Sequence, residues 1–276
     1  MSLKGIATET LEILERGSYR APSGAMRHIG AELSSAKKGT SLYTPEQLAS
    51  LLEEPSREVV SSSAQIDVTL ERTQVAARRL CQDEGIADVV LLNFASARNA
   101  GGGFINGAKA QEEDLSRCSG LYPCLLEQTG YYTANRAQSS MLYTDHIIYS
   151  PGVPFFRERS RSLLEEPYTA AVITAPAPNA GQHLRRKPTG HDAIEEALRR
   201  RAAYVLLVAK QEGHRTLLLG AWGCGVFQNR PAMVADAFGT WLDAPEFATA
   251  FDRVCFAIYD RTRERRTFEA FRQRLD

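Results

Sequence analysis

A glycine triplet and an acidic run lie close together in the sequence. Gly101 to Gly103 are followed, after seven residues, by Gln111-Glu112-Glu113-Asp114. Glycines carry no Cβ, so their backbone can take a positive φ and approach a ligand closely, and their N–H groups could form a concave site for phosphate or sugar oxygens. Carboxyl groups beside such a loop could transfer a proton to or from a bound sugar. The spacing indicates acid–base chemistry on a sugar or phosphate ligand.

The two glutamates cannot do the same work. Neighbouring side chains on a helix diverge by about 100°, so we expect one of Glu112 and Glu113 to hold a substrate hydroxyl while the other faces the bond that breaks. Like charge and burial would raise the pKa of a carboxyl group here, whereas the helix dipole would lower it. The alternative interpretation is a flexible surface turn before an acidic helix start, which the dipole favours by about 0.3–1 kcal/mol.

A second glycine-rich loop, Gly220-Ala-Trp-Gly-Cys-Gly-Val-Phe-Gln-Asn229, lies between a predicted strand and a predicted helix. Gly223 and Gly225 open a turn whose N–H groups, beside a helix N-terminus, suit a pyrophosphate. Phe227 could stack against a sugar or a base. The alternative is a tight turn with Trp222 and Phe227 buried.

The cysteines predict neither a nucleophile nor a metal site. Cys224 has no histidine nearby in the sequence, so we expect a small buried thiol. The five cysteines are scattered and form no CxxC pair, and there is no HExxH motif. We therefore expect reduced thiols in a cytoplasmic protein, with no zinc site and no cofactor.

The elements around the two loops predict the fold class. Residues 87–94 form a near-continuous apolar run that ends just before the glycine triplet, as in a strand covered on both faces. Strands are also predicted at 66–70, 146–150, 171–175, 216–220 and 254–259, and helices at 73–82, 111–128, 192–212, 231–242 and 263–275. Such alternation predicts an α/β sandwich with a mainly parallel or mixed central sheet, whose ligands bind at loops beyond the strand ends.

The N-terminal part has a different character. Residues 1–62 are predicted to form a helical extension packed on a main domain at 63–276. An apolar stripe that includes Leu11 and Leu14 fits one helix, and 44–52 fits a short capped helix. A polar linker at 53–63 follows.

The amino-acid composition excludes some classes of binding partner. The 276 residues include 33 Lys and Arg and 33 Asp and Glu, so the formal charge is zero. A surface that coats nucleic acid would need a basic excess, so any polyanion should be bound at a defined site. No apolar run approaches the roughly 20 residues of a membrane helix, and the start does not resemble a secretory signal.

Both loops match one known family. The stretch NFASARNAGGGFINGAKAQEEDLSRCSGLY resembles the bacterial-type poly(ADP-ribose) glycohydrolases, which carry Gly-Gly-Gly, a spacer and Gln-Glu-Glu. The segment GAWGCGVFQN is similar to the diphosphate loop of that family. Ala100 departs from the pattern, because the family is expected to have proline before the triplet.

The resemblance implies a macrodomain fold, a three-layer α/β/α sandwich with a mixed central sheet and an N-terminal helical extension. It implies hydrolysis of ribose–ribose O-glycosidic bonds in poly(ADP-ribose), with release of ADP-ribose. Glu113 would be the general acid/base and Glu112 would hold ribose hydroxyls. The implied substrate-binding residues are Gly101, Gly102, Gly103, Asn106, Gln111, Gly223, Cys224, Gly225, Val226 and Phe227, with Asn93 and Ser96 as weaker candidates.

Within this scheme the glycine triplet would surround the distal ribose, 223–226 would bind the pyrophosphate and Phe227 would order the terminal ribose. A basic loop of His183, Arg185, Arg186 and Lys187 could meet the next phosphate, although a solvated loop is favoured. The resemblance also implies ADP-ribosylated proteins as substrates, a monomer and a role in the DNA damage response, with no membrane and no sequence-specific nucleic acid as partner.

Three other functions remain open from the sequence. A non-catalytic ADP-ribose-binding macrodomain would have the same site, although paired glutamates give little advantage in binding an anion. A mono-ADP-ribosyl or acyl-ester hydrolase would differ in its dependence on chain length. A purely structural domain would bind no ADP-ribose.

Overall fold

A mixed sheet of seven strands forms the centre of the molecule, in the order β3-β6-β7-β5-β8-β9-β4. The computed structural model describes residues 2–53, 64–158 and 162–276. The strands are β3 (Ser41–Tyr43), β4 (Gln65–Thr69), β5 (Val89–Phe94), β6 (Ile147–Glu158), β7 (Ser162–Ala175), β8 (Thr216–Gly220) and β9 (Arg253–Ala257). The pairs β7–β5, β5–β8, β8–β9 and β9–β4 are parallel, and β3–β6 and β6–β7 are antiparallel. The predicted mixed sheet is confirmed.

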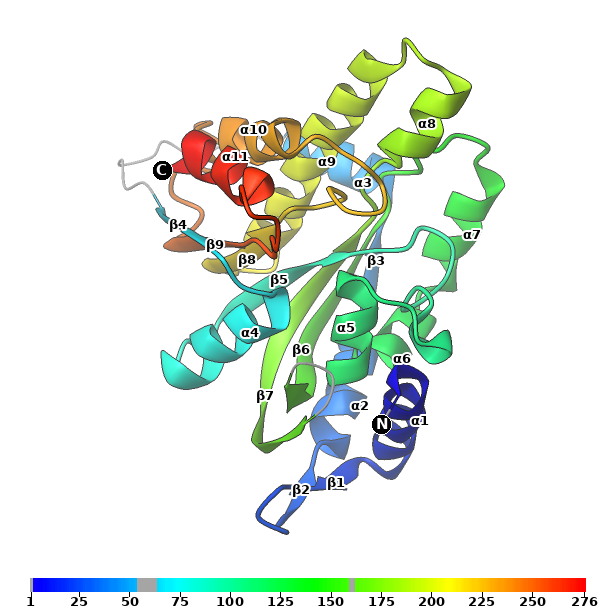
Figure 1. Cartoon of the computed structure of the whole chain (residues 1–276), viewed down its shortest axis with the longest axis vertical. Helices are drawn as coiled ribbons and strands as arrows, with labels where there is room; N and C mark the ends of the chain where they lie inside the picture. The colour runs from blue at the N-terminus through cyan, green and yellow to red at the C-terminus, as the bar shows by residue number, and fades with distance from the viewer. Residues whose placement is uncertain (1, 54–63, 159–161) are drawn as a thin grey trace.

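Helices cover both faces of this sheet (Figure 1). They are α1 (Leu3–Arg16), α2 (Gly30–Gly39), α3 (Pro45–Leu52), α4 (Thr73–Arg78), α5 (Gln111–Cys118), α6 (Leu121–Leu126), α7 (Thr129–Ala137), α8 (Ala180–Arg186), α9 (His191–Gln211), α10 (Pro231–Leu242) and α11 (Arg266–Leu275). Short helices η1 (Arg79–Asp83, a π-helix) and η2 (Phe104–Asn106, a 3₁₀-helix) follow α4 and the glycine triplet. The three-layer α/β/α arrangement is therefore as predicted.

Strand β5 shows why its sequence is apolar throughout. Val90 and Leu92 lie in the core beneath α9 and α10, whereas Val89 and Leu91 lie in the core beneath α4 and α5. Because side chains alternate across a strand, only a strand buried on both faces needs apolar residues at every position. Its carboxyl end, at Phe94, leads directly into the loop that carries the glycine triplet.

The N-terminal region is built into the same body. The short hairpin of β1 (Ser18–Arg20) and β2 (Met26–His28) follows α1, and β3 then adds to the edge of the central sheet against β6. Helix α1 lies against α5 and η2, next to the glycine loop. The predicted boundary between residues 62 and 63 lies outside the described residues.

The structure corrects three predictions. The region 1–62 was predicted to be helical, but it also contains β1, β2 and β3, and β3 pairs with β6 of the central sheet. The single helix predicted at 111–128 is wrong, because the chain becomes extended at Ser119, where it forms a bridge with Phe155 of β6, and α6 begins afterwards. The predicted basic loop is also wrong: His183, Arg185 and Arg186 belong to α8, and His183 is buried. In the parts of the chain that the structure describes, no helix is long and apolar enough to cross a membrane.

Candidate active site

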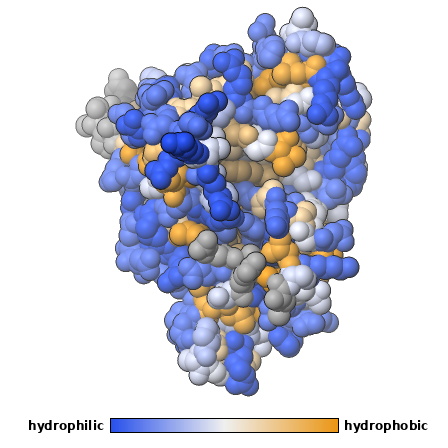
Figure 2. Space-filling view, viewed as in Figure 1, coloured by the Kyte–Doolittle hydropathy of each residue, from blue (hydrophilic) through white to orange (hydrophobic). Residues whose placement is uncertain are grey.

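The two glycine-rich loops meet at one cleft, at the carboxyl ends of the parallel strands β5 and β8. The cleft has a volume of about 2060 Å³, and the face in Figure 2 is hollowed near its middle, with hydrophobic residues inside a largely hydrophilic rim. Predicted residues that line it are Ser96, Gly102, Gly103, Asn106, Gln111, Glu112, Glu113, Gly223, Cys224, Gly225, Val226 and Phe227. Gly101 and Asn93 are buried and are not among the lining residues.

The glycine triplet holds Glu113. The backbone N–H of Gly103 donates to Oε1 of Glu113 over 2.9 Å. Gly101 and Gly102 have φ of +66° and +58°, and a Cβ added to Gly102 would fall on the Glu113 carboxylate. These positions require glycine because the loop must turn in the left-handed region directly against a carboxyl group.

Glu112 lies in a different environment. Its side chain is buried, and its two oxygens accept hydrogen bonds from Nδ2 of Asn93 (3.2 Å) and from the backbone N–H of Ser96 (2.7 Å). Burial raises the pKa of Glu112 to about 8, and the nearby Glu113 charge adds to this, although both hydrogen bonds act in the opposite direction. The two neighbouring glutamates therefore lie in different environments, as their different directions on the helix predict.

Gln111 fixes the start of α5 to the end of β5. Its Oε1 accepts from the backbone N–H of Phe94, and its Nε2 donates to the carbonyl oxygen of Leu92, each over 2.8 Å. The side-chain amide therefore satisfies backbone groups at the strand end, as a further strand would. Gln111 lines the cleft, but its amide is engaged in positioning the two glutamates that follow it.

The second loop folds back on the end of β7. Gly223 has φ of +71°, and a Cβ there would meet the side chains of Asn229 and Ala177. Asn229 is buried and donates from Nδ2 to the carbonyl oxygen of Pro178 over 2.9 Å. Gly225 has nothing within 4 Å of an added Cβ, and Val226 is 78% exposed. One glycine is required by the protein itself, whereas the other leaves open space at the cleft.

Cys224 was expected to be buried, but it is only partly buried and lines the cleft. Burial raises its pKa to about 12, so the thiolate is rare at neutral pH. Among the described residues there is no group of three or more His, Cys, Asp or Glu side chains that could hold a metal ion.

Residues 7–158 match the family described as microbial-type PARG, catalytic domain. This chain belongs to that family. It is 47% identical to the poly(ADP-ribose) glycohydrolase of Thermomonospora curvata, with 99% of each chain covered and a TM-score of 0.92. The Deinococcus radiodurans enzyme in complex with ADP-ribose is 46% identical, with a TM-score of 0.82 over 90% of this chain and 98% of that one. A comparison with curated proteins found no match.

This member of the microbial PARG family has cleft residues that sequence reasoning did not find. The guanidinium of Arg72 lies 3.7 Å from the ring centroid of Tyr259 and also forms an ion pair of 2.9 Å with Asp114. Both Arg72 and Tyr259 line the cleft. The sequence offered one signal for this pair, namely that Tyr259 ends a predicted strand. Arg72 and Tyr259 are far apart in the chain, so no local pattern could relate them.

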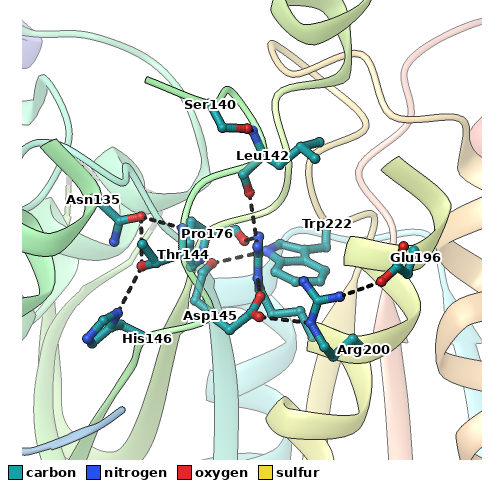
Figure 3. Close-up of polar contacts among 12 residues, drawn as sticks. Asn135, Ser140, Leu142, Thr144, Asp145, His146, Pro176, Glu196, Arg200 and Trp222 are labelled. Carbon is teal, nitrogen blue, oxygen red and sulfur yellow. Dashed lines mark hydrogen bonds and ion pairs between the residues drawn. The ribbon is translucent and has the colours of Figure 1, made fainter. Parts of the chain in front are cut away.

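A buried ion pair holds the segment that follows β7, next to the cleft. Its partners Asp145, Leu142 and Pro176 are labelled in Figure 3. Arg201 of α9 is fully buried, and its Nε donates to Asp145 over 2.8 Å. Its other nitrogens donate to the carbonyl oxygens of Pro176 and Leu142. Pro176 directly precedes Ala177, which lines the cleft beside Gly223. The network thus fixes the strand end against which the second loop folds.

Proposed function

We propose that this protein hydrolyses the ribose–ribose O-glycosidic bonds of poly(ADP-ribose) and releases ADP-ribose, with Glu113 as the general acid/base. One observation carries the proposal. Glu113 is held by the Gly103 N–H at a cleft that the second glycine loop also lines. The related glycohydrolases, one bound to the inhibitor ADP-HPD and one to ADP-ribose, support ADP-ribose as the ligand.

The reaction needs one proton carrier. Protonated Glu113 donates its proton to the leaving ribose 2′-oxygen as the bond from that oxygen to the anomeric carbon breaks. The bonding electrons leave with the oxygen, and positive charge develops on the distal ribose as an oxocarbenium ion. The phosphate oxygens of the bound unit stabilise this charge. The Glu113 carboxylate then takes a proton from a water molecule, and the resulting hydroxide oxygen bonds to the anomeric carbon.

Glu112 has a binding role in this mechanism. Glycosidases with two catalytic carboxyl groups place them across the bond, about 5–9 Å apart according to mechanism. Here one Glu112 oxygen accepts a hydrogen bond from Asn93 and the other accepts one from Ser96. Neither oxygen is therefore free to attack the anomeric carbon as a nucleophile. A ribose hydroxyl can still donate to the remaining lone pairs. A dissociative route with a single acid/base follows.

The experiment is release of free ADP-ribose from purified polymer by the wild-type protein and by Glu113→Gln. Loss of a positioned acid/base should reduce the rate about 10²–10⁴-fold, while calorimetric titration should show ADP-ribose binding retained. Near-normal turnover by Glu113→Gln would contradict the assignment. Binding by the wild type without release would instead favour a non-catalytic ADP-ribose reader.

Three further proposals rest on the sequence resemblance. We infer that the protein is a cytoplasmic monomer, that ADP-ribosylated proteins are its substrates and that it acts in the DNA damage response. Sedimentation velocity tests the monomer, cell fractionation tests the location, and sensitivity of a deletion strain to DNA-damaging agents tests the role.

A further inference from the structure

The cleft has more room than one nucleotide sugar needs. Small-molecule sites typically occupy about 300–1000 Å³, whereas this cleft measures about 2060 Å³. The mechanism above uses the two glycine loops and the glutamates, but the lining also includes Arg98, Thr129, Tyr132 and Arg136. The mechanism above gives this second part of the wall no role.

Helix α7 presents one face to this part of the cleft. Thr129, Tyr132 and Arg136 are spaced by three and four residues, which places them on the same side of the helix. Arg136 donates from Nη1 to the carbonyl oxygen of Arg98 over 2.8 Å, so α7 is joined to the loop that follows β5. Asn135, labelled in Figure 3, accepts hydrogen bonds from the N–H and the hydroxyl of Thr144. These bonds fix α7 to the segment before β6.

Charge on this wall is not neutralised by the protein. Within 2–53, 64–158 and 162–276, neither Arg98 nor Arg136 forms an ion pair with a carboxylate. Two acidic residues of the same cleft are already engaged: Asp114 pairs with Arg72 and Arg117, and Glu158 pairs with Arg78. In a chain of zero formal charge, this leaves a local cationic site that suits phosphate oxygens.

A buried hydroxyl in the same wall also lacks a protein partner. Tyr132 is 4% exposed and lines the cleft, yet its hydroxyl has no hydrogen-bond partner among the described residues. Protein atoms cover this oxygen, so a water molecule inside the wall, and not a ligand in the cleft, is the partner that such a buried group needs. Burial raises the pKa of Tyr132 well above its usual value, and the Glu112 carboxylate adds to this.

An apolar surface adjoins these polar groups. Leu126 of α6 is one of the few large hydrophobic residues that are exposed, and it lines the cleft together with Tyr122. An exposed leucine beside an aromatic ring can pack against the flat face of a base.

We propose that Arg98, Arg136 and Tyr132 form a subsite for the ADP-ribose unit that hydrolysis leaves behind on the polymer. The two guanidinium groups bind its diphosphate, Tyr132 lines the same wall, and its adenine packs on Tyr122 and Leu126. The inference rests on the proposed function, since only a polymer supplies a second unit next to the bond that Glu113 protonates.

The test compares two pairs of arginines. The Arg98→Gln/Arg136→Gln double variant should raise KM for polymer about tenfold, the change that the loss of about 1.4 kcal/mol of binding gives. Its Kd for ADP-ribose should stay within about twofold of wild type, and its KM should depend less steeply on salt. Arg185→Gln/Arg186→Gln on α8, an equally basic pair outside the cleft lining, should leave KM unchanged.

Single variants test whether the KM increase comes from lost binding or from a disturbed fold. Arg98→Gln changes an exposed side chain that forms no hydrogen bond or ion pair with another described residue, so its share of the KM increase is not expected to come from a disturbed fold. Tyr132→Phe removes only the covered hydroxyl and should leave KM for polymer at the wild-type value, because that oxygen is not open to the cleft.

The outcomes separate the two proposals. An unchanged KM for the double variant would overturn the subsite while leaving the glycohydrolase function intact. An equal loss of ADP-ribose affinity would also overturn it, because these residues would then bind the terminal unit. A KM increase confined to the α8 pair would place the polymer over α8 instead. No ADP-ribose release by the wild type would overturn both proposals.

Discussion

At the scale of single residues, Glu112 and Glu113 show how the environment separates two identical side chains. Glu113 is held at the cleft by one backbone N–H, whereas Glu112 is buried beneath it and has a pKa raised to about 8. Oδ1 of Asn93 has no hydrogen-bond partner among the described residues, so this amide can turn over and accept a hydrogen bond from protonated Glu112. The buried carboxyl group is therefore compatible with both charge states.

The raised pKa of Glu112 predicts how stability depends on pH. The folded protein keeps a proton on Glu112 that the unfolded chain releases near pH 4.5, so the stabilisation is present below that pH and is lost as pH rises to about 8. The slope is at most about 1.4 kcal/mol per pH unit. Glu112→Gln, which is neutral at every pH, should flatten the decline of the free energy of unfolding between pH 5 and 8.

Denaturant titrations at pH 5, 6.5 and 8 measure this decline. Glu195→Gln, at an exposed glutamate of α9, is the control and should keep the wild-type slope. Parallel curves for Glu112→Gln and wild type would show that Glu112 does not hold its proton in the folded state.

At the scale of elements, the two loops use glycine for different reasons. Gly102 and Gly223 combine a positive φ with neighbours that exclude a Cβ, whereas Gly225 has free space around it. The side-chain amide of Gln111 joins α5, which carries the two glutamates, to the end of β5 by two hydrogen bonds. The surroundings of each glycine therefore decide whether the fold requires it or whether it leaves room for a ligand.

Alanine at the two glycines of the second loop separates these roles. Gly223→Ala should lower the free energy of unfolding by about 1–3 kcal/mol, because the new Cβ is strained and crowded. Gly225→Ala should change it by less than about 0.5 kcal/mol, yet should weaken ADP-ribose binding at least about tenfold if the backbone contacts the diphosphate. Thermal unfolding and calorimetric titration measure the two effects, and an unaltered Kd for Gly225→Ala would remove this loop from the diphosphate site.

At the scale of the whole molecule, one buried arginine joins separate parts of the cleft wall. Arg201 links α9 to the segment before β6 and to the end of β7. Arg201→Met should cost about 3–5 kcal/mol, since it breaks a buried pair and leaves two carbonyl groups unsatisfied. Arg200→Met removes a half-exposed partner of the same Asp145 and should cost less than about 1 kcal/mol. Similar losses in chemical denaturation would argue against a special role for the buried arginine.

The sequence by itself predicted the candidate site residues and most of the elements from residue 64 onward. The triplet and its acidic run, the second loop, the doubly buried strand β5 and the mixed α/β fold were all predicted, because each depends on local spacing or on hydrophobic period. Local pattern failed where contacts across the chain decide the backbone: Ser119 is extended because it pairs with Phe155 of β6, which interrupts the helix predicted through it.

Only the tertiary structure decided which groups share the cleft. It placed the second loop beside Glu113, turned Gln111 toward the β5 backbone and brought Arg98, Tyr132 and Arg136 together on a second wall. It also set the pKa of Glu112, which depends on burial by distant segments. Residue types and spacing specify what a side chain can do, whereas exclusion of water and proximity to other groups arise only when the chain packs.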